Sequence, residues 1–574
     1  MLLFFLQLPF PLFVPFIFAA VLNRIGPVAL LGLILALAVS PTVAVSKRLL
    51  RKAVRIPESA VRMPMLVRAG SGAGKSRFLG RLFVWQEFWL GTPQVVIDSE
   101  GQTIDNFLDK LMRLPEVLLE MGVSVDKVHE VQASLLSRVR YIDLGNDDYV
   151  VPLPFLYRLG NESLSVIGSR FFEVVKSLDV DLKSAPMLGK NAFRRCSVNI
   201  SMILYALGMQ LTEAEQVLRN PEAWLGRARK ALEQYPDELP PAIRYLEKLS
   251  QANEGARERM TTSFFNKLDP LILSPAMRAT FGASLPGLVL QEIRNHSLIV
   301  LVDGRNLKGE ETSEFALRWV WDNIIQDVKI RGPNRDDPLL LVVDELSTMV
   351  PSDQDAADQF AKELDKVISV LARNRSLRVC LATQELGQYS PRLQRTLLFM
   401  PIQFQGRSQD EKTAETLARL YFRHDPHKVK KTVPVWMSDM LGPYVVDHTT
   451  EEYTPEEQLL AERDMYLEMP KFKFLVRFPS EEGDVANNVV WASIANLDPG
   501  QYPDSLFLSQ VRERITIHDG QPIQEILAQI DARSKTKKDR PAKGTGRPIA
   551  ETRLIHTDGQ DEPEEVPIFT IEDD

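Results

Sequence analysis

The segment 66-LVRAGSGAGKSRFLG-80 decides how the first part of the chain folds. A short apolar run stops, and five of the eight residues from Ala69 to Ser76 are Gly or Ala. Glycine adopts backbone conformations that other residues avoid, and it allows another group to approach the backbone closely. The run before it has the character of a buried strand, and the run after it that of a helix. We therefore expect a strand, a tight turn with trimmed side chains, and a helix.

This turn has the spacing of a phosphate-binding loop, with Ala69 in place of the usual first glycine. Lys75 would reach the β- and γ-phosphates, and the Ser76 hydroxyl would coordinate Mg²⁺. The helix that opens at Lys75 would point the positive end of its dipole at the anion. ATP and Mg²⁺ are therefore the expected cofactors. The expected nucleotide-binding residues are Gly70, Ser71, Gly72, Ala73, Gly74, Lys75 and Ser76.

A second motif, 339-LLLVVDEL-346, is an apolar run that ends in two acids. Such a run predicts a strand buried on both faces of a parallel sheet. Asp344 would hold Mg²⁺ and Glu345 would polarise the attacking water. The alternative is a buried strand with a solvated acidic end, which is less common for two adjacent acids downstream of a phosphate-binding loop.

Further apolar runs alternate with helical patterns along the chain. They predict strands near 64–69, 93–98, 137–143, 297–303, 338–344 and 377–383. This order indicates an α/β fold with a doubly wound, mainly parallel sheet, in which ligands bind at the carboxyl ends of the strands. Gln384 follows the run 377–383 and could sense the γ-phosphate; the alternative is a simple strand cap.

Two uncharged apolar segments, 1–22 and 27–45, open the chain. Each is close to the ~20 residues that cross a bilayer as a helix. Five Lys or Arg residues follow within 47–55, which places that end in the cytoplasm and predicts a transmembrane helical hairpin. Two alternatives remain: a signal peptide, or a first segment made re-entrant by its prolines.

Composition sets broad limits for the rest of the chain. Its 574 residues, 45% hydrophobic and 25% charged, are enough for several globular cores. A net charge of −8 gives no bulk signal for nucleic acid, so such a partner would need local basic surfaces. Cys196 and Cys380 cannot form a disulfide framework or a CxxC metal site, which favours a reduced, cytosolic main body.

Taken in order, these stretches resemble the FtsK/HerA branch of P-loop ATPases. Within that branch they are most similar to the TraG/TraD-like coupling proteins of conjugation and type IV secretion. The resemblance covers about residues 60–500 and the apolar N-terminus. It rests on VIDSEGQ (96–102), YIDLGNDDYVVPLPFL (141–156), LIVLVDGRN (298–306), LARNRSLRVCLATQEL (371–386), FMPIQFQGRSQDEKTAETLARLY (399–421) and FKFLVRFP (472–479).

The resemblance implies a RecA-like P-loop ATPase with an inserted all-helical domain and an N-terminal membrane hairpin. It implies Asp344 and Glu345 as the Walker B acids and Gln384 as the sensor. Arg373 lies where such proteins keep an arginine finger for the neighbouring subunit's ATP, and Arg375 is a close rival. Ser99 and Glu100 replace the Pro-Lys pair of the family pattern.

The expected domains follow from these segments and from composition. They are 1–55, the transmembrane hairpin and its basic flank; 56–157 and 286–500, the two parts of the nucleotide-binding domain; 158–285, the inserted all-helical domain; 501–529, a helical extension; and 530–574, a disordered charged tail.

The function that the resemblance implies is a homo-hexameric ATPase of the bacterial inner membrane with a cytoplasmic main body. It would couple ATP hydrolysis to transfer of DNA, or of a protein–DNA conjugate, through a type IV secretion channel. Its partners would be channel proteins and DNA held by a relaxase complex. One alternative is a HerA/FtsK-like translocase without secretion, and another is a non-hydrolysing membrane scaffold. The paired acids and Gln384 favour turnover.

Overall fold

The structure is a computed structural model of the 574-residue chain. It describes residues 56, 62–178, 187–331, 338–351, 354–371, 377–421, 424–439, 442–479, 488–493 and 505–535. The expected membrane hairpin of residues 1–55, Arg373, Arg375 and residues 536–574 lie outside them. Among the described residues, none of the helices is both long and apolar enough to cross a membrane.

A nine-stranded sheet forms the centre of the molecule, in the order β12-β11-β8-β1-β7-β6-β2-β5-β3. The strands from β8 to β3 are parallel, whereas β11 and β12 are antiparallel additions at one edge. All six strands expected from the apolar runs are confirmed. They are β1 (Met65–Arg68), β2 (Gln94–Asp98), β3 (Val139–Asp143), β5 (Ile299–Asp303), β6 (Leu339–Asp344) and β7 (Leu377–Thr383). The other three strands of the sheet are β8 (Ile402–Gln405), β11 (Lys473–Phe478) and β12 (Asn488–Ser493).

Both faces of this sheet are covered, which explains why its strands are apolar without alternation. In β6, Leu341 and Val343 belong to one hydrophobic cluster, and Leu340 and Val342 to the other. One face carries α5 (Lys75–Phe78), η1 (Leu79–Val84), α6 (Trp85–Trp89), α7 (Gln102–Met112), α8 (Leu114–Glu120) and α9 (Val125–Leu136). The other carries α18 (Leu290–Asn295), α19 (Glu310–Arg331), η4 (Leu346–Met349), α20 (Gln354–Lys366), η5 (Val367–Leu371), α22 (Pro391–Leu398) and α23 (Glu411–Tyr421).

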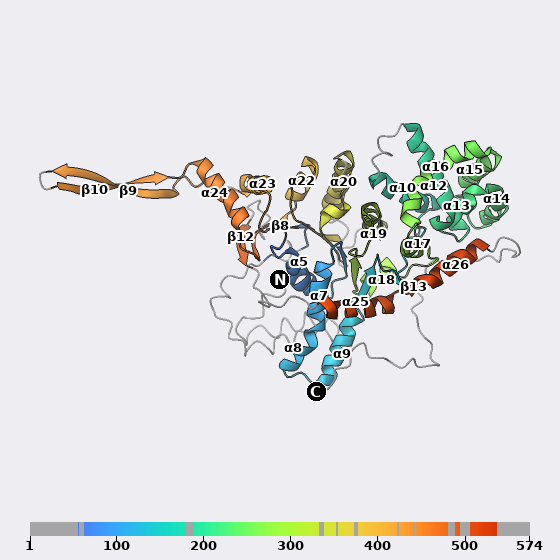
Figure 1. The fold of residues 1–574 in the computed structure, drawn as a ribbon, viewed down its shortest axis with the longest axis horizontal. Helices are drawn as coiled ribbons and strands as arrows, with labels where there is room; N and C mark the ends of the chain where they lie inside the picture. The colour runs from blue at the N-terminus through green and yellow to red at the C-terminus, as the bar shows by residue number, and fades with distance from the viewer. Residues whose placement is uncertain are drawn as a thin grey trace.

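The stretch expected to form an inserted helical domain is helical. It contains α10 (Leu164–Leu178), α12 (Met187–Ala206), η2 (Leu211–Glu213), α13 (Ala214–Arg219), α14 (Pro221–Lys230), η3 (Ala231–Glu233), α15 (Pro240–Gln251), α16 (Glu254–Ile272) and α17 (Pro275–Gly282). These helices gather at one end of the molecule, in green in Figure 1. Phe155 and Phe281 stack with ring centroids 4.6 Å apart, and Phe155 packs edge-on against Trp319 of α19, which joins the helices to the sheet.

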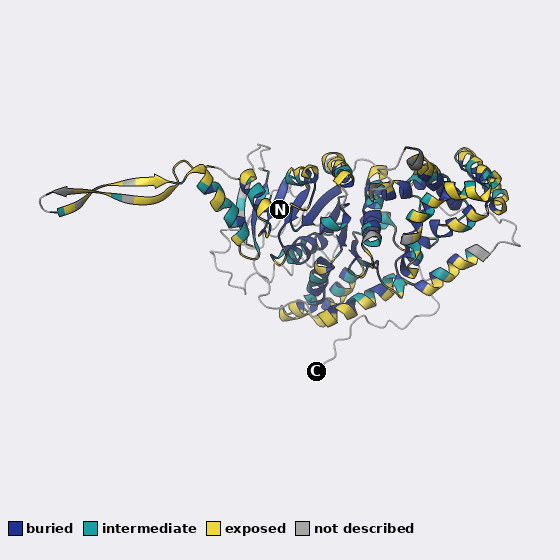
Figure 2. Cartoon of the chain, turned by 45° about the horizontal axis from the view of Figure 1, so that its top comes forward, coloured by how far each residue is buried: buried dark blue, intermediate teal, exposed yellow. Residues whose placement is uncertain are grey.

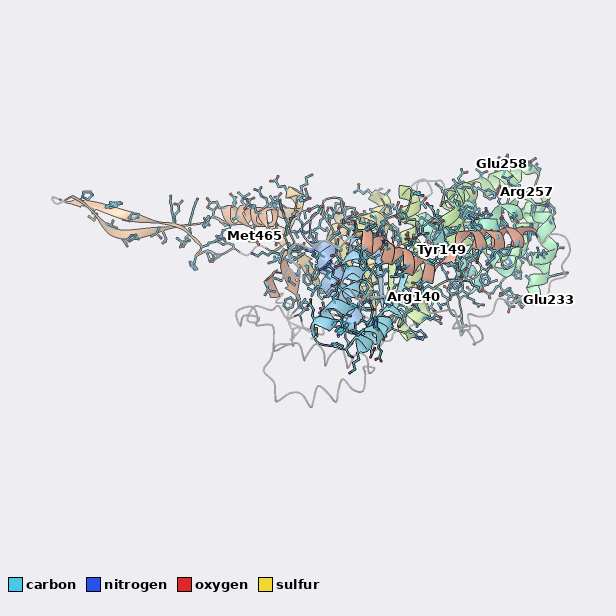
Figure 3. All side chains as sticks on the ribbon, turned by 60° about the horizontal axis from the view of Figure 1, so that its bottom comes forward. Arg140, Tyr149, Glu233, Arg257, Glu258 and Met465 are labelled. Atoms are coloured by element: carbon cyan, nitrogen blue, oxygen red, sulfur yellow. The ribbon has the colours of Figure 1, made fainter. Side chains whose placement is uncertain are left out.

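The last described segment is a strap, residues 505–535, made of α25 (Ser505–Asp519), β13 (Gln521–Pro522) and α26 (Ile523–Lys535). Figures 1 and 3 show it running beneath the sheet toward the helical end, past Tyr149. β13 pairs with β4 (Tyr149–Val150), and three isoleucines of α26 pack against Ala276 and Ala279 of α17. The helix continues to Lys535, beyond residue 530, where the sequence predicts that the charged tail begins.

A long hairpin, β9 (Val429–Asp439) with β10 (Gly442–Glu452), projects from the opposite end, just before α24 (Pro455–Glu468). Figure 1 shows it extending away from the body, and Figure 2 shows that much of its described surface is exposed. Trp436 is 59% exposed and Met437 55%. Nothing in the sequence pattern predicted this protruding hairpin.

Candidate nucleotide-binding site

Four neighbouring parallel strands end in aspartate at the same edge of the sheet. Asp98 at the end of β2 stands in register with Asp344 of β6 and with Asp303 of β5. Asp143 ends β3 in register with Asp303. β1 reaches this edge two strands away from β6 and leads directly into the glycine-rich loop. The sheet therefore brings the two sequence motifs to one place, at the carboxyl ends of its strands.

The glycine-rich loop turns sharply into α5. Gly72 has φ 70° and Gly74 has φ 104°, left-handed conformations that glycine adopts without strain. The helix begins at Lys75, immediately after Gly74. The loop therefore presents its backbone and the start of a helix to the edge where the aspartates end, as a phosphate-binding loop requires.

Lys75 joins the two motifs, although 270 residues separate it from Glu345. Its Nζ lies 2.8 Å from Oδ1 of Asp344 and 2.9 Å from Oε2 of Glu345. Burial lowers the pKa of Lys75, but the two carboxylates outweigh burial and hold the pKa above its ordinary value. The three predicted residues therefore form one buried, charged cluster.

Glu345 is held in an unusual backbone conformation, with φ 67°. Left-handed geometry is strained for a residue with a Cβ, and such residues cluster at functional sites. The Ser347 hydroxyl donates a 2.6 Å hydrogen bond to Oε1 of Glu345, and the Thr348 hydroxyl donates to its carbonyl oxygen at 2.9 Å. The carboxylate is therefore fixed from two sides, by Lys75 and by Ser347.

Thr103, at the start of α7, was not predicted from the sequence. Its hydroxyl donates a 2.6 Å hydrogen bond to Oδ2 of Asp344 and lies 3.4 Å from the carbonyl oxygen of Ser76. It thus connects α5, α7 and β6 at the expected magnesium position. The sequence could have pointed to Thr103 through its position, because it follows Asp98 by five residues and so falls at the edge where the ligand was expected.

Asp98 organises the turn that carries Thr103. Its carboxylate is buried and accepts N–H donors from Gly101 at 2.8 Å and from Thr103 at 2.7 Å, with longer bonds from Glu100 and Ile104. Burial, followed by the carboxylates of Asp344 and Asp303, raises the pKa of Asp98 to about 8, although the N–H donors oppose this rise. The acid that the sequence places at the end of this strand therefore caps α7.

Gln384 follows β7, which lies between β1 and β6 in the sheet. The side chain is half-buried, and the preceding residue, Thr383, accepts a 3.2 Å hydrogen bond from the backbone N–H of Ala69 at the start of the phosphate-binding loop. The next residue, Glu385, accepts a 2.7 Å hydrogen bond from the backbone N–H of Gln409, and the Gln409 side chain donates to the Ser71 carbonyl oxygen at 3.2 Å. The structure places Gln384 at the correct edge and leaves its role as a sensor a prediction.

The residues at this edge suit a magnesium–nucleotide complex better than a metal ion alone. Among the described residues, no group of three or more His, Cys, Asp or Glu side chains could hold a metal. Mg²⁺ usually keeps several waters and takes one or two carboxylates plus substrate phosphates. Asp344 and the Ser76 hydroxyl provide that smaller set beside the phosphate-binding loop. The donor set therefore fits the expected cofactors.

Comparison with known proteins gives structural matches alone. No family model matches the chain, and no curated protein does. The chain is similar to the bacterial conjugative coupling protein TrwB in its unbound monoclinic form, at 14% identity and TM-score 0.45, over 78% of this chain and 88% of that chain. TrwB in complex with ADP and Mg²⁺ matches at 14% identity and TM-score 0.45, over 78% and 89% of the two chains.

A third match is VirB4 of Thermoanaerobacter pseudethanolicus, at 14% identity and TM-score 0.37, over 72% of this chain and 86% of that chain.

Proposed function

We propose that this chain is a P-loop ATPase that binds magnesium–ATP between the glycine-rich loop and the end of β6, and hydrolyses it. The observation that carries this proposal is the position of Lys75, whose Nζ lies 2.8 Å from Asp344 and 2.9 Å from Glu345. A buried lysine with two carboxylates at the end of a phosphate-binding loop has the donors and acceptors that phosphoryl transfer to water needs.

Lys75 acts by exchanging partners. When a triphosphate enters the loop, the ammonium group turns from the two carboxylates to the β- and γ-phosphate oxygens. Asp344, which accepts a hydrogen bond from Thr103, would hold magnesium together with Ser76. Bound magnesium would neutralise charge on the phosphate oxygens. The exchange frees Glu345 to accept a hydrogen bond from the attacking water.

Glu345 is the residue on which hydrolysis depends, because it supplies the base that orients the water. Glu345→Gln keeps the size of the side chain and should leave ATP binding close to wild type. The hydrolysis rate should fall by about a hundred-fold or more, as expected for loss of a general base. Binding is measured by isothermal titration calorimetry and turnover by phosphate release.

Glu116→Gln, an exposed position on α8, is the matched control and should hydrolyse ATP at the wild-type rate. Wild-type turnover by the Glu345→Gln protein would remove this carboxylate from the mechanism.

We also propose that the ATPase belongs to a membrane-anchored homo-hexamer of the bacterial inner membrane, with its main body in the cytoplasm. It would move DNA, or a protein–DNA conjugate delivered by a relaxase, into a type IV secretion channel. The resemblance of the motifs to TraG/TraD-like coupling proteins supports this proposal, as do the two uncharged N-terminal segments and their basic flank. In this arrangement 56–157 and 286–500 form the motor, and the helices of 158–285 face the cargo.

Two measurements separate this proposal from its alternatives. Full-length protein in detergent should hydrolyse ATP faster when DNA is added; a scaffold would hydrolyse none. Deleting the gene should abolish plasmid transfer between cells if the motor serves secretion. Normal transfer together with DNA-stimulated hydrolysis would indicate the HerA/FtsK-like translocase instead.

A further inference from the structure

Phe472 lies directly against the phosphate-binding loop. Its backbone N–H donates a 2.9 Å hydrogen bond to the carbonyl oxygen of Ala73. A Cβ atom added at Gly74 would lie 2.6 Å from Cε1 of the Phe472 ring, which is too close for any side chain. The ring therefore packs on the bare backbone of Gly74, the residue that precedes Lys75.

The backbone of Phe472 adopts a strained conformation. Its φ is 63°, a left-handed conformation that is strained for a residue with a Cβ. Among the described residues, two other non-glycine residues have a positive φ, Ser297 and Glu345. Glu345 belongs to the proposed catalytic site. Two of these three positions in the described residues, Glu345 and Phe472, therefore lie beside the phosphate-binding loop.

The ring of Phe472 is less buried than that of its neighbour Phe474. Phe474, two residues further on, is fully buried and packs its ring 5.7 Å from that of Phe78. Phe472, in contrast, is only half-buried. Core packing alone does not account for a half-buried aromatic ring on a residue with positive φ.

Arg77 adds a positive charge at the same end of the loop. The carbon at the centre of its guanidinium lies 5.7 Å from the centroid of the Phe472 ring, within the range of a cation–π interaction. Lys75, two residues earlier, contacts Asp344 and Glu345 instead. An elongated anion bound along the loop would thus have its terminal phosphates at Lys75 and its other end near Phe472 and Arg77.

We propose that Phe472 is the platform on which the base of the bound nucleotide stacks, with Arg77 beside it; this inference rests on the proposed ATPase function. Stacking on an aromatic face accepts every base, because every base has a π-face, and it favours those with the larger face. The substrate class is therefore a purine nucleoside triphosphate, with little discrimination between ATP and GTP and weaker binding of CTP and UTP.

The experiment compares a ligand that has a base with one that has none. Magnesium–ATP and magnesium–tripolyphosphate are titrated into the full chain by isothermal titration calorimetry. Phe472→Leu keeps an apolar side chain but removes the ring face, and it should bind ATP about ten-fold more weakly, in line with the usual effect of losing one base–aromatic stack. Its affinity for tripolyphosphate should equal that of wild type, and Phe472→Trp should keep ATP affinity.

Phe399→Leu is the matched control, because Phe399 is 77% exposed at the end of α22 and is distant in sequence from the loop. It should bind both ligands as wild type does. A second measurement needs no substitution: 2-aminopurine riboside triphosphate should lose fluorescence on binding to the wild-type protein, because stacking quenches it.

The outcomes are distinct. Equal weakening of ATP and tripolyphosphate in Phe472→Leu would mean that the ring supports the loop and not the base, and would overturn the platform. Unchanged ATP affinity in that variant, or unquenched 2-aminopurine, would overturn it as well. A wild-type protein that binds neither ligand would overturn the proposed ATPase itself.

Discussion

Lys75 already has two anionic partners before any nucleotide arrives, so a triphosphate must replace an existing ion pair. Removing one partner of a buried pair leaves an uncompensated charge, whereas exchanging partners does not. Phosphate oxygens for Lys75 and magnesium for Asp344 make such an exchange. Lys75 therefore supplies one positive charge that the carboxylates of Asp344 and Glu345 share when no nucleotide is bound.

Asp98 gives the site a dependence on pH. Because the pKa of Asp98 is about 8 in the folded protein and the carboxyl group of an unfolded chain titrates near about 4, the folded state binds this proton more tightly. The proton stabilises the fold at low pH, and that stabilisation is lost as the pH rises toward 8. For nucleotide-free protein, the Tm of wild type minus that of Asp98→Asn should fall between pH 5 and pH 8.5.

The melting experiment uses thermal denaturation in EDTA. Asp126→Asn, an exposed position on α9, is the control and should follow wild type at both pH values. A Tm difference between wild type and Asp98→Asn that is the same at pH 5 and pH 8.5 would show that Asp98 does not take up a proton in this range.

The chemical roles of Lys75, Ser76, Asp344 and Glu345 stay predictions from the motifs. That Lys75 lies beside Asp344 and Glu345 was predictable, because a phosphate-binding loop and an acidic strand end have a recognisable order. Thr103 and Phe472 were not, because long-range packing rather than a local pattern brings them to the loop. Their sequence neighbourhoods look like an ordinary helix start and an ordinary strand start.

At the scale of elements, η1 packs closely against α7, the helix that carries Thr103. Gly80 of η1 packs against α7, where an added Cβ would lie 2.8 Å from Cβ of Asn106. α7 carries Thr103, which holds Asp344. A displacement of η1 is therefore transmitted from α7 to the acidic end of β6.

Gly80→Ala should destabilise the protein by about 1–3 kcal/mol, as overpacking of a close contact does. It should also weaken ATP binding, because α7 and Thr103 must move. Gly226→Ala is the matched control: Gly226 is an exposed residue of α14 with no atom within 4 Å of an added Cβ. That change should stabilise the protein by about 0.5–1 kcal/mol. Urea denaturation measures both, and a neutral Gly80→Ala would contradict the account.

The strands were predictable because parallel strands buried on both faces must be apolar throughout, and six such runs stand out in the sequence. The helical span 158–285 was predictable because no ordinary crossover is that long. The protruding hairpin was not, since its strands mix charged, polar and apolar residues without a buried face to order them. Its existence depends on pairing between its own two strands.

At the scale of the whole molecule, the additions to the sheet lie at opposite ends. The helices of 158–285 and the end of the strap occupy one end, and the protruding hairpin the other (Figure 1). The strap ties the sheet to the helices: the Asp519 carboxylate accepts a 2.9 Å hydrogen bond from the backbone N–H of Tyr141 in β3, and Ile530 of α26 is fully buried. The hairpin joins the body at its base, where the N–H of Tyr453 donates to the Lys428 carbonyl oxygen at 2.9 Å and Lys430 pairs with Glu457 of α24 at 2.6 Å.

Replacing 429–452 with a short Gly-Ser link should therefore leave the body intact. A two-stranded hairpin is marginally stable by itself and adds little to the stability of the body it leaves. The Tm should change by less than about 2 °C, well under the shift expected for a 1 kcal/mol loss in a small domain. Calorimetry measures this, and a drop larger than about 5 °C would show that the hairpin is part of the core.

The exposed tip of the hairpin also makes the protein its own fluorescent reporter. The chain has seven tryptophans, of which Trp224, Trp319 and Trp321 are at most 3% exposed, whereas Trp436 is 59% exposed. Iodide in solution will quench Trp436 far more readily than those three indoles. A molecule that binds over Trp436 will protect this indole from iodide and restore its emission. Binding to the hairpin can therefore be detected without a label.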